Sequence, residues 1–138
     1  MLDLFNPFFG LFVTINLLAL LVLFASWKSE DVGRLIYAGV FLIAGLVNAW
    51  LGIFAPKTYL YFGQQTWLRL YEDFIYGFFS EYTTLIILGI AACQILIAVG
   101  LFFRGNLWLP AFYGAVFYLW AMLPLGLGAA FPAIFIMV

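Results

Sequence analysis

The chain has 138 residues, of which 68% are hydrophobic and 8% are charged, whereas a soluble domain has about 45–50% and about 25% respectively. A water-soluble fold is excluded, because it could not bury so much apolar surface. The net charge of −1, with five Lys and Arg residues in total, supplies no basic patch for phosphates, so nucleic acid is excluded as a partner.

Four long stretches of the sequence contain no charged residue. The hydrocarbon core of a bilayer is about 30 Å thick and a helix rises about 1.5 Å per residue, so about 20 apolar residues cross it. The sequence therefore predicts an all-α integral membrane protein, a four-transmembrane-helix bundle that forms a single transmembrane domain over residues 1–138. The charge-free stretches are residues 4–27, 35–56, 82–103 and 105–138.

The first predicted span covers residues 7–27. Asn6 followed by Pro7 is typical of a helix start, since Pro at the first helical position loses no hydrogen bond. No positive charge precedes the span, and no small-residue cleavage site precedes Lys28. We therefore expect a retained helix and not a secretory signal.

The second predicted span covers residues 32–55, with Ser29 placed to cap its start and Pro56 to end it. Small residues recur at helical spacing along this span and along the third. Such faces predict close contact between helices. They comprise Gly39, Gly45 and Gly52 in the second span, and Gly89, Cys93 and Gly100 in the third.

An interfacial amphipathic helix over residues 65–79 is predicted between the second and third spans. Its large apolar residues repeat at helical spacing, on the side opposite Arg69, Glu72 and Asp73. Such a helix lies in the head-group plane with its aromatic side facing the acyl chains. That side comprises Trp67, Leu70, Tyr71, Phe74 and Phe78.

The third predicted span covers residues 82–104. Ser80 and Glu81 place a hydroxyl and a carboxylate at the positive end of its dipole. Arg104 and Gly105 provide a cation at the negative end and a glycine beyond it, which is typical of a helix end.

The fourth predicted span covers residues 107–123, with Asn106 as its cap and Pro110 in its first turn. The 34 uncharged residues that contain it are too many for one span and too few for two. Two paths are open. Either a glycine-rich bend leads to a hydrophobic C-terminal tail over residues 124–138, or a kinked helix runs on to about Ala130.

Two amides, Asn48 and Gln94, fall within the apolar spans. Each either hydrogen-bonds across a helix interface or holds the carbonyl of a ligand. Together with Trp67 and Tyr71 they are the candidate binding residues for a quinone or a lipid. With no His and one Cys, the chain predicts no catalytic set, no metal site and no cofactor of its own.

Basic residues at the span ends predict the orientation of the protein. Lys28, Arg34 and Arg104 fall on one side of the membrane, and Lys57 and Arg69 fall on the other. The positive-inside rule then places both termini outside the cytoplasm. The expected location is the plasma membrane of a bacterium or an archaeon, as a multi-pass protein.

The run from Gly33 to Leu46, GRLIYAGVFLIAGL, resembles the opening helix of the DoxX-like membrane proteins, and Cys93 to Arg104 is similar to that family's second span. Gln94 stands where the family has glutamate, so a proton-handling role at that place is not carried over. The resemblance covers residues 33–125 of this chain. It implies a four-helix membrane protein associated with redox complexes that pass electrons from thiosulfate or thiols to quinone, as a small subunit without its own cofactor.

Three hypotheses for the function follow. The first is a non-catalytic subunit or accessory protein of a larger membrane complex, with membrane lipids and other membrane subunits as partners. The second is a component of a membrane oxidoreductase that contributes to a quinone or lipid site. The third is a small carrier or channel, which ranks last because the spans hold few ionisable groups to line a water-filled path.

Overall fold

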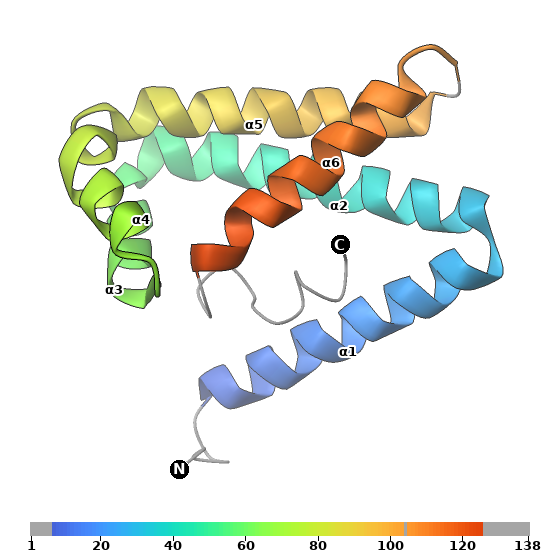
Figure 1. Ribbon diagram of the computed structural model, residues 1–138, viewed down its shortest axis with the longest axis horizontal. Helices are drawn as coiled ribbons and strands as arrows, with labels where there is room; N and C mark the ends of the chain where they lie inside the picture. Colours follow the sequence, from blue (N-terminus) through green and yellow to red (C-terminus); the bar gives the residue numbers. More distant parts are fainter. Residues whose placement is uncertain (1–6, 104, 126–138) are drawn as a thin grey trace.

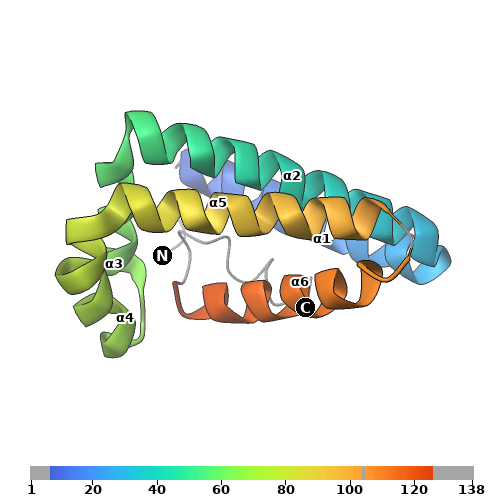
Figure 2. The ribbon, with the colours of Figure 1, turned by 90° about the horizontal axis from the view of Figure 1, so that it is seen from above.

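The computed structural model describes residues 7–103 and 105–125, with side chains described from residue 13 onward. Every regular element in this part of the chain is helical (Figures 1 and 2). The elements are α1 (Pro7–Lys28), α2 (Glu30–Phe54), the 3-10 helix η1 (Pro56–Tyr61), α3 (Phe62–Gln65), α4 (Arg69–Phe74), the π-helical turn η2 (Ile75–Phe79), α5 (Ser80–Phe102) and α6 (Trp108–Met122).

Among the described residues, three helical segments are long and apolar enough to cross a membrane: Glu30–Phe54, Arg69–Phe102 and Trp108–Leu125. This confirms an all-helical protein of the membrane type. The apolar part of α1 with described side chains, Val13–Lys28, is shorter, so the count of four spans stays a prediction. The path of residues 126–138, which carries most of the predicted C-terminal tail, lies outside the described residues.

Helices α2 and α5 run antiparallel and side by side in both views (Figures 1 and 2). Two of the predicted small-residue positions explain how closely they approach. A Cβ atom at Gly45 would lie 2.8 Å from Ile95 Cγ1 and 3.1 Å from the Ala91 carbonyl oxygen, and one at Gly52 would lie 2.8 Å from Ile87 Cγ2. A larger residue at Gly45 therefore requires the α5 backbone to move, and one at Gly52 requires the Ile87 side chain to move.

The other predicted small-residue positions differ from one another. No atom lies within 4 Å of the Cβ position at Gly39 or Gly89, and Cys93 is exposed, so these three residues face away from the described helices. Gly100 does make a close contact, but with α6, where its Cβ would lie 2.5 Å from the Cβ of Ala111. Spacing along one helix cannot distinguish an inner from an outer small-residue face.

Helix α6 crosses the α2 and α5 pair obliquely (Figure 1). Small side chains permit this crossing, and the ring of Phe41 packs edge-on against Tyr118 with 5.5 Å between centroids. The resulting core consists of Ala38, Phe41, Ala98, Leu101, Ala111, Ala115 and Leu119.

The short helices α3 and α4 run across one end of the α2 and α5 pair in both views (Figures 1 and 2). Ile75 and Phe79, four residues apart, bury their side chains in a second core with Tyr59, Ile87 and Leu125. The sequence pattern had singled out the exposed aromatic side of this segment and not the buried pair. That the segment lies at the membrane interface stays a prediction.

Helix α4 continues into α5 through η2. Ser80 was expected to cap α5, and this expectation is wrong: its hydroxyl donates to the carbonyl oxygens of Tyr76 at 2.9 Å and Gly77 at 2.7 Å. Gly77 itself leaves helical geometry, with φ −92° and ψ −113°. The chain therefore kinks at Gly77, within the wider π turn, and changes direction from α4 into α5 there.

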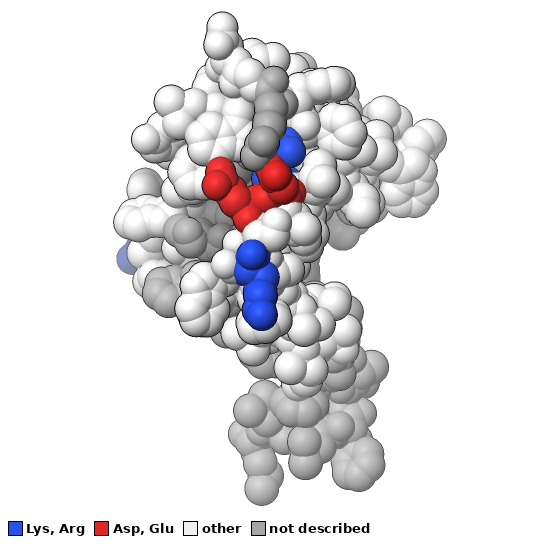
Figure 3. Space-filling view, turned by 90° about the vertical axis from the view of Figure 1, so that its right-hand side faces the viewer, with Lys and Arg blue, Asp and Glu red and all other residues white. Residues whose placement is uncertain are grey.

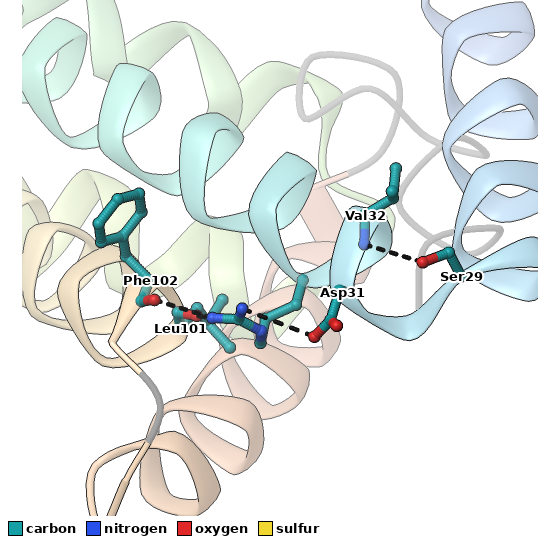
Figure 4. Close-up of polar contacts among 6 residues, drawn as sticks. Ser29, Asp31, Val32, Leu101 and Phe102 are labelled. Carbon is teal, nitrogen blue, oxygen red and sulfur yellow. Dashed lines mark hydrogen bonds and ion pairs between the residues drawn. The ribbon is translucent and has the colours of Figure 1, made fainter.

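Ser29 alone separates α1 from α2. Its hydroxyl accepts from the Val32 amide at 3.4 Å, which confirms the predicted cap (Figure 4). The turn is tight, because a Cβ at Gly33 would lie 2.5 Å from Ser26 Oγ. Figure 3, which views this end of the molecule, shows acidic side chains gathered beside basic ones on an otherwise uncharged surface.

Arg34 provides the cation at the C-terminal end of α5, beside Leu101 and Phe102, which are labelled in Figure 4. Its Nη1 donates to the carbonyl oxygen of Leu101 and, at 2.8 Å, to that of Phe102, while Nη2 lies 3.7 Å from the Asp31 carboxylate. The last carbonyls of a helix lack partners within it, and a positive charge there also favours the dipole. The sequence had assigned this role to Arg104, which lies outside the described residues.

The turn into α6 also differs from expectation at one residue. Asn106 does not cap the helix: Leu107 occupies the cap position and makes no side-chain bond. Instead the Gly105 carbonyl, at a glycine with φ +146°, accepts from the Trp108 amide at 3.2 Å. Pro110 lies in the first turn of α6 as predicted, because no intrahelical bond needs its missing N–H.

Candidate functional site

A chain of hydrogen bonds joins four polar side chains between the helices. Tyr59 donates its hydroxyl hydrogen to Asn48 Oδ1 at 2.6 Å, Asn48 Nδ2 donates to Gln94 Oε1 at 2.7 Å, and Gln94 Nε2 donates to the Tyr118 hydroxyl at 2.8 Å. The four side chains come from η1, α2, α5 and α6. The structure therefore brings together two of the predicted candidates, Asn48 and Gln94, and adds a tyrosine at each end.

The polar chain lies inside the protein. Gln94 is 2% exposed and is the most deeply buried large side chain of the described residues, and Tyr59 is 8% exposed. Burial raises the pKa of Tyr59 above its ordinary value, so its hydroxyl keeps the hydrogen that it donates. In an apolar interior each unpaired amide or hydroxyl would cost free energy, and the chain of bonds avoids that cost at both amides.

Position along the helices explains why the two amides meet. Gly45 and Gly52 bring the α2 backbone close to α5, and Asn48 lies between these glycines. Gln94 is one of the α5 residues that a Cβ at Gly45 would touch, at 3.3 Å. The glycines thus bring the backbones near enough for two short amide side chains to bond directly.

The other two candidates, Trp67 and Tyr71, lie where α6 ends. Trp67 Nε1 donates to the Leu123 carbonyl oxygen at 3.3 Å, and the Tyr71 hydroxyl donates to that of Ala121 at 2.9 Å. Thr66 adds a bond from its hydroxyl to the Pro124 carbonyl oxygen at 2.7 Å. These donors satisfy carbonyls at the end of α6 that have no partner within the helix.

Replacing Thr66 by valine is expected to loosen the end of α6, since Val has the same shape and cannot donate. The substitution removes this hydrogen bond and a longer one, of 3.4 Å, that the hydroxyl accepts from the Leu68 amide, and it should lower the free energy of unfolding by about 1 kcal/mol. Hydrogen exchange of purified protein should show faster exchange at the amides of the last turn of α6. Thr84→Val is the matched control, because Thr84 is an exposed threonine on α5. Equal effects of both substitutions would contradict a capping role for Thr66.

The two groups of candidates share one apolar core. Tyr71 packs against the core that contains Tyr59, and Tyr59 begins the polar chain. The ring of Tyr59 also lies 6.0 Å from that of Phe62, measured between centroids. The hydrogen bonds from Tyr59 to Tyr118 can hold the helices together without any charged group. A ligand that bound to Asn48 or Gln94 would have to displace the side chains that already bond to these amides.

Sequence reasoning missed Tyr59, Thr66 and Tyr118. Eight tyrosines are spread along the chain, and no local pattern distinguishes the two whose hydroxyls reach a buried amide. The available signal was that buried amides in a bundle need partners. Over the described residues, no group of three or more His, Cys, Asp or Glu side chains could hold a metal ion.

Comparison with known proteins gives no family for this chain: no family model, no curated protein and no solved structure matches it.

Proposed function

We propose that this chain is a four-span, non-catalytic subunit or accessory protein of a larger membrane assembly. Helix α1 is the fourth span, since its 22 residues are long enough to cross the hydrocarbon core. Helix α4 lies at the membrane interface. Its course across the end of α2 and α5 supports this placement, as does the exposure of Trp67 at 67% and Leu70 at 76% (Figure 1).

The outward face of α5 is the observation that carries the proposal. Gly89, Ala92 and Cys93 are exposed there, near the middle of the helix, between the large exposed side chains of Leu85 and Leu96. Glycine within a helix costs roughly 0.5–1 kcal/mol relative to alanine, and no atom of the described residues lies within 4 Å of the Cβ position at Gly89 to account for it. Small residues four apart are the surfaces that membrane helices use to approach each other closely.

The interior supports a structural role in the same way. The polar atoms of Asn48 and Gln94 bond to each other and to two tyrosines, so these amides serve helix packing. Membrane bundles use amides as interhelical hydrogen-bonding groups. We therefore assign the inner polar residues to folding of the chain and the outer small residues to contact with another subunit.

A photoreactive phenylalanine analogue placed at Ala92 tests this proposal in native membranes. We expect a covalent product with one defined second membrane protein, which mass spectrometry identifies. The same analogue at Ile43 is the control, because Ile43 is 65% exposed at the middle of α2 and should react with lipid alone. Purification in mild detergent should recover the same second protein without crosslinking.

Three results would contradict the proposal. They are lipid adducts alone at both positions, equal protein adducts at both positions, and a crosslink only between two differently tagged copies of this chain. The last would identify a homo-oligomer.

The resemblance of residues 33–46 to the DoxX-like proteins suggests that the partner is redox-linked, and the identity of the crosslinked protein tests that suggestion directly.

A further inference from the structure

A pocket of about 460 Å³ lies between α1, α2, α5 and α6, at the end of the molecule opposite α3 and α4 (Figure 1). This volume falls within the range of about 300–1,000 Å³ that is usual for ligand sites. Its walls contain none of the residues in the Tyr59 to Tyr118 chain of hydrogen bonds. The pocket is therefore separate from the candidate site described above.

The pocket extends along most of α6. Its wall on α6 runs from Trp108 to Leu119, a rise of about 16 Å at about 1.5 Å per residue. This is roughly half of the hydrocarbon thickness of about 30 Å. Trp108 lies at the shallow end, where the turns joining α1 to α2 and α5 to α6 are found, and tryptophan prefers the membrane interface.

Polar and apolar walls are separated along this depth. Glu30 and Arg34 line the shallow end, and Leu23, Val116 and Leu119 line the deep end. A molecule that fits must carry charges or hydrogen-bonding groups at one end and a hydrocarbon chain at the other. Membrane phospholipids of the adjoining leaflet have this form.

Arg34 is held in place to meet a phosphate. Its Nη1 is bonded to the Leu101 and Phe102 carbonyls, which fixes the guanidinium (Figure 4). Its Nη2 is 3.7 Å from Asp31, beyond hydrogen-bond distance, so Nη2 retains donors for another acceptor. Guanidinium groups match phosphate oxygens well in charge and geometry.

The two charged side chains that line the pocket select the head group. Glu30 lies one helical turn before Arg34 on α2, and both line the shallow end. A purely anionic head group would meet repulsion from the Glu30 carboxylate. A zwitterionic head group with an ammonium N–H can place its phosphate at Arg34 and donate to Glu30.

We propose that the pocket binds one phosphatidylethanolamine molecule of the adjoining leaflet. The phosphate contacts Arg34, the ammonium group contacts Glu30, and one acyl chain lies along Val116 and Leu119. This inference rests on the membrane placement proposed above, including α1 as a span. It does not depend on the partner subunit.

Native mass spectrometry of the isolated chain tests the inference. The protein is exchanged into detergent that contains equal amounts of phosphatidylethanolamine, phosphatidylglycerol, phosphatidylcholine and a quinone. We expect retention of one phosphatidylethanolamine per chain. Because an exposed ion pair contributes about 0.2–1 kcal/mol, Glu30→Gln should lower this retention about threefold without lowering that of phosphatidylglycerol.

Two further variants complete the test. Val116→Trp fills the deep end of the pocket and should abolish lipid retention, whereas Glu81→Gln removes an exposed carboxylate at the far end of α5 and should change nothing. Arg34 is left intact, because it also caps α5. Equal retention of the three lipids, preferential retention of quinone, or unchanged retention in Val116→Trp would overturn the inference. None of these results would alter the crosslinking result at Ala92, so the two proposals fail independently.

Discussion

Replacing Gly45 by leucine is expected to lower the free energy of unfolding by about 3 kcal/mol, the upper part of the range for overpacked interiors. A Cβ at this position already lies 2.8 Å from Ile95 Cγ1 and 3.1 Å from the Ala91 carbonyl oxygen. The Ile95 side chain can rotate away, but the Ala91 carbonyl is backbone and moves only with α5. Equilibrium unfolding by SDS in mixed micelles, followed by tryptophan fluorescence, measures the change.

Gly39→Leu is the matched control on the same helix. No atom of the described residues lies within 4 Å of the Cβ position at Gly39, so a side chain there starts in open space and does not press on α5. Because leucine favours a helix over glycine, we expect unchanged stability or a gain of up to about 1 kcal/mol. Equal losses at the two glycines would mean that α2 and α5 do not pack through the face that contains Gly45.

Replacing Gln94 by leucine is expected to cost about 2 kcal/mol of unfolding free energy. Leucine fills nearly the same volume, but it leaves the Asn48 amide without its acceptor and the Tyr118 hydroxyl without its donor. Buried groups that lose partners each cost about 1–3 kcal/mol, although hydrogen bonds measured within membranes average nearer about 0.6 kcal/mol. The same SDS titration measures this loss.

A double-mutant cycle that combines Gln94→Leu with Asn48→Leu measures the interaction energy between these two side chains, apart from their other contacts. We expect the double variant to be more stable than the sum of the single losses predicts, by about 1 kcal/mol, because the second substitution removes a group that the first left unpaired. Additive losses would show that the two amides act independently. If they held a ligand, ligand retention would fall in each single variant while stability changed little.

The helices near Asn48 and Gln94 were predictable from local chemistry. Helix α2 begins after Ser29, whose hydroxyl caps an amide of the first turn, and it ends before Pro56, which has no amide hydrogen. Both effects act within a few residues, so the local sequence is enough to predict them. Ser80 shows the limit of such reasoning. Its hydroxyl is equally suited to donate backward to a carbonyl, and the π turn before it provides two acceptors.

The candidate site was only partly predictable. Asn48 and Gln94 stood out because polar groups inside a span require partners, and their antiparallel helices meet at Gly45 and Gly52. The bonds from Trp67 and Tyr71 to α6 could not be foreseen in the same way. These bonds join residues about fifty positions apart. The spacing of apolar residues along the sequence does not show which helix end needs a hydrogen-bond donor.

The single residue between α1 and α2 has a consequence for biosynthesis. On the four-span placement proposed above, a connector as short as Ser29 makes α1 and α2 a helical hairpin that enters the bilayer as one unit. Lys28, Glu30 and Asp31 then lie together at its tip. The hairpin is synthesised before α5, whose carbonyls Arg34 later meets.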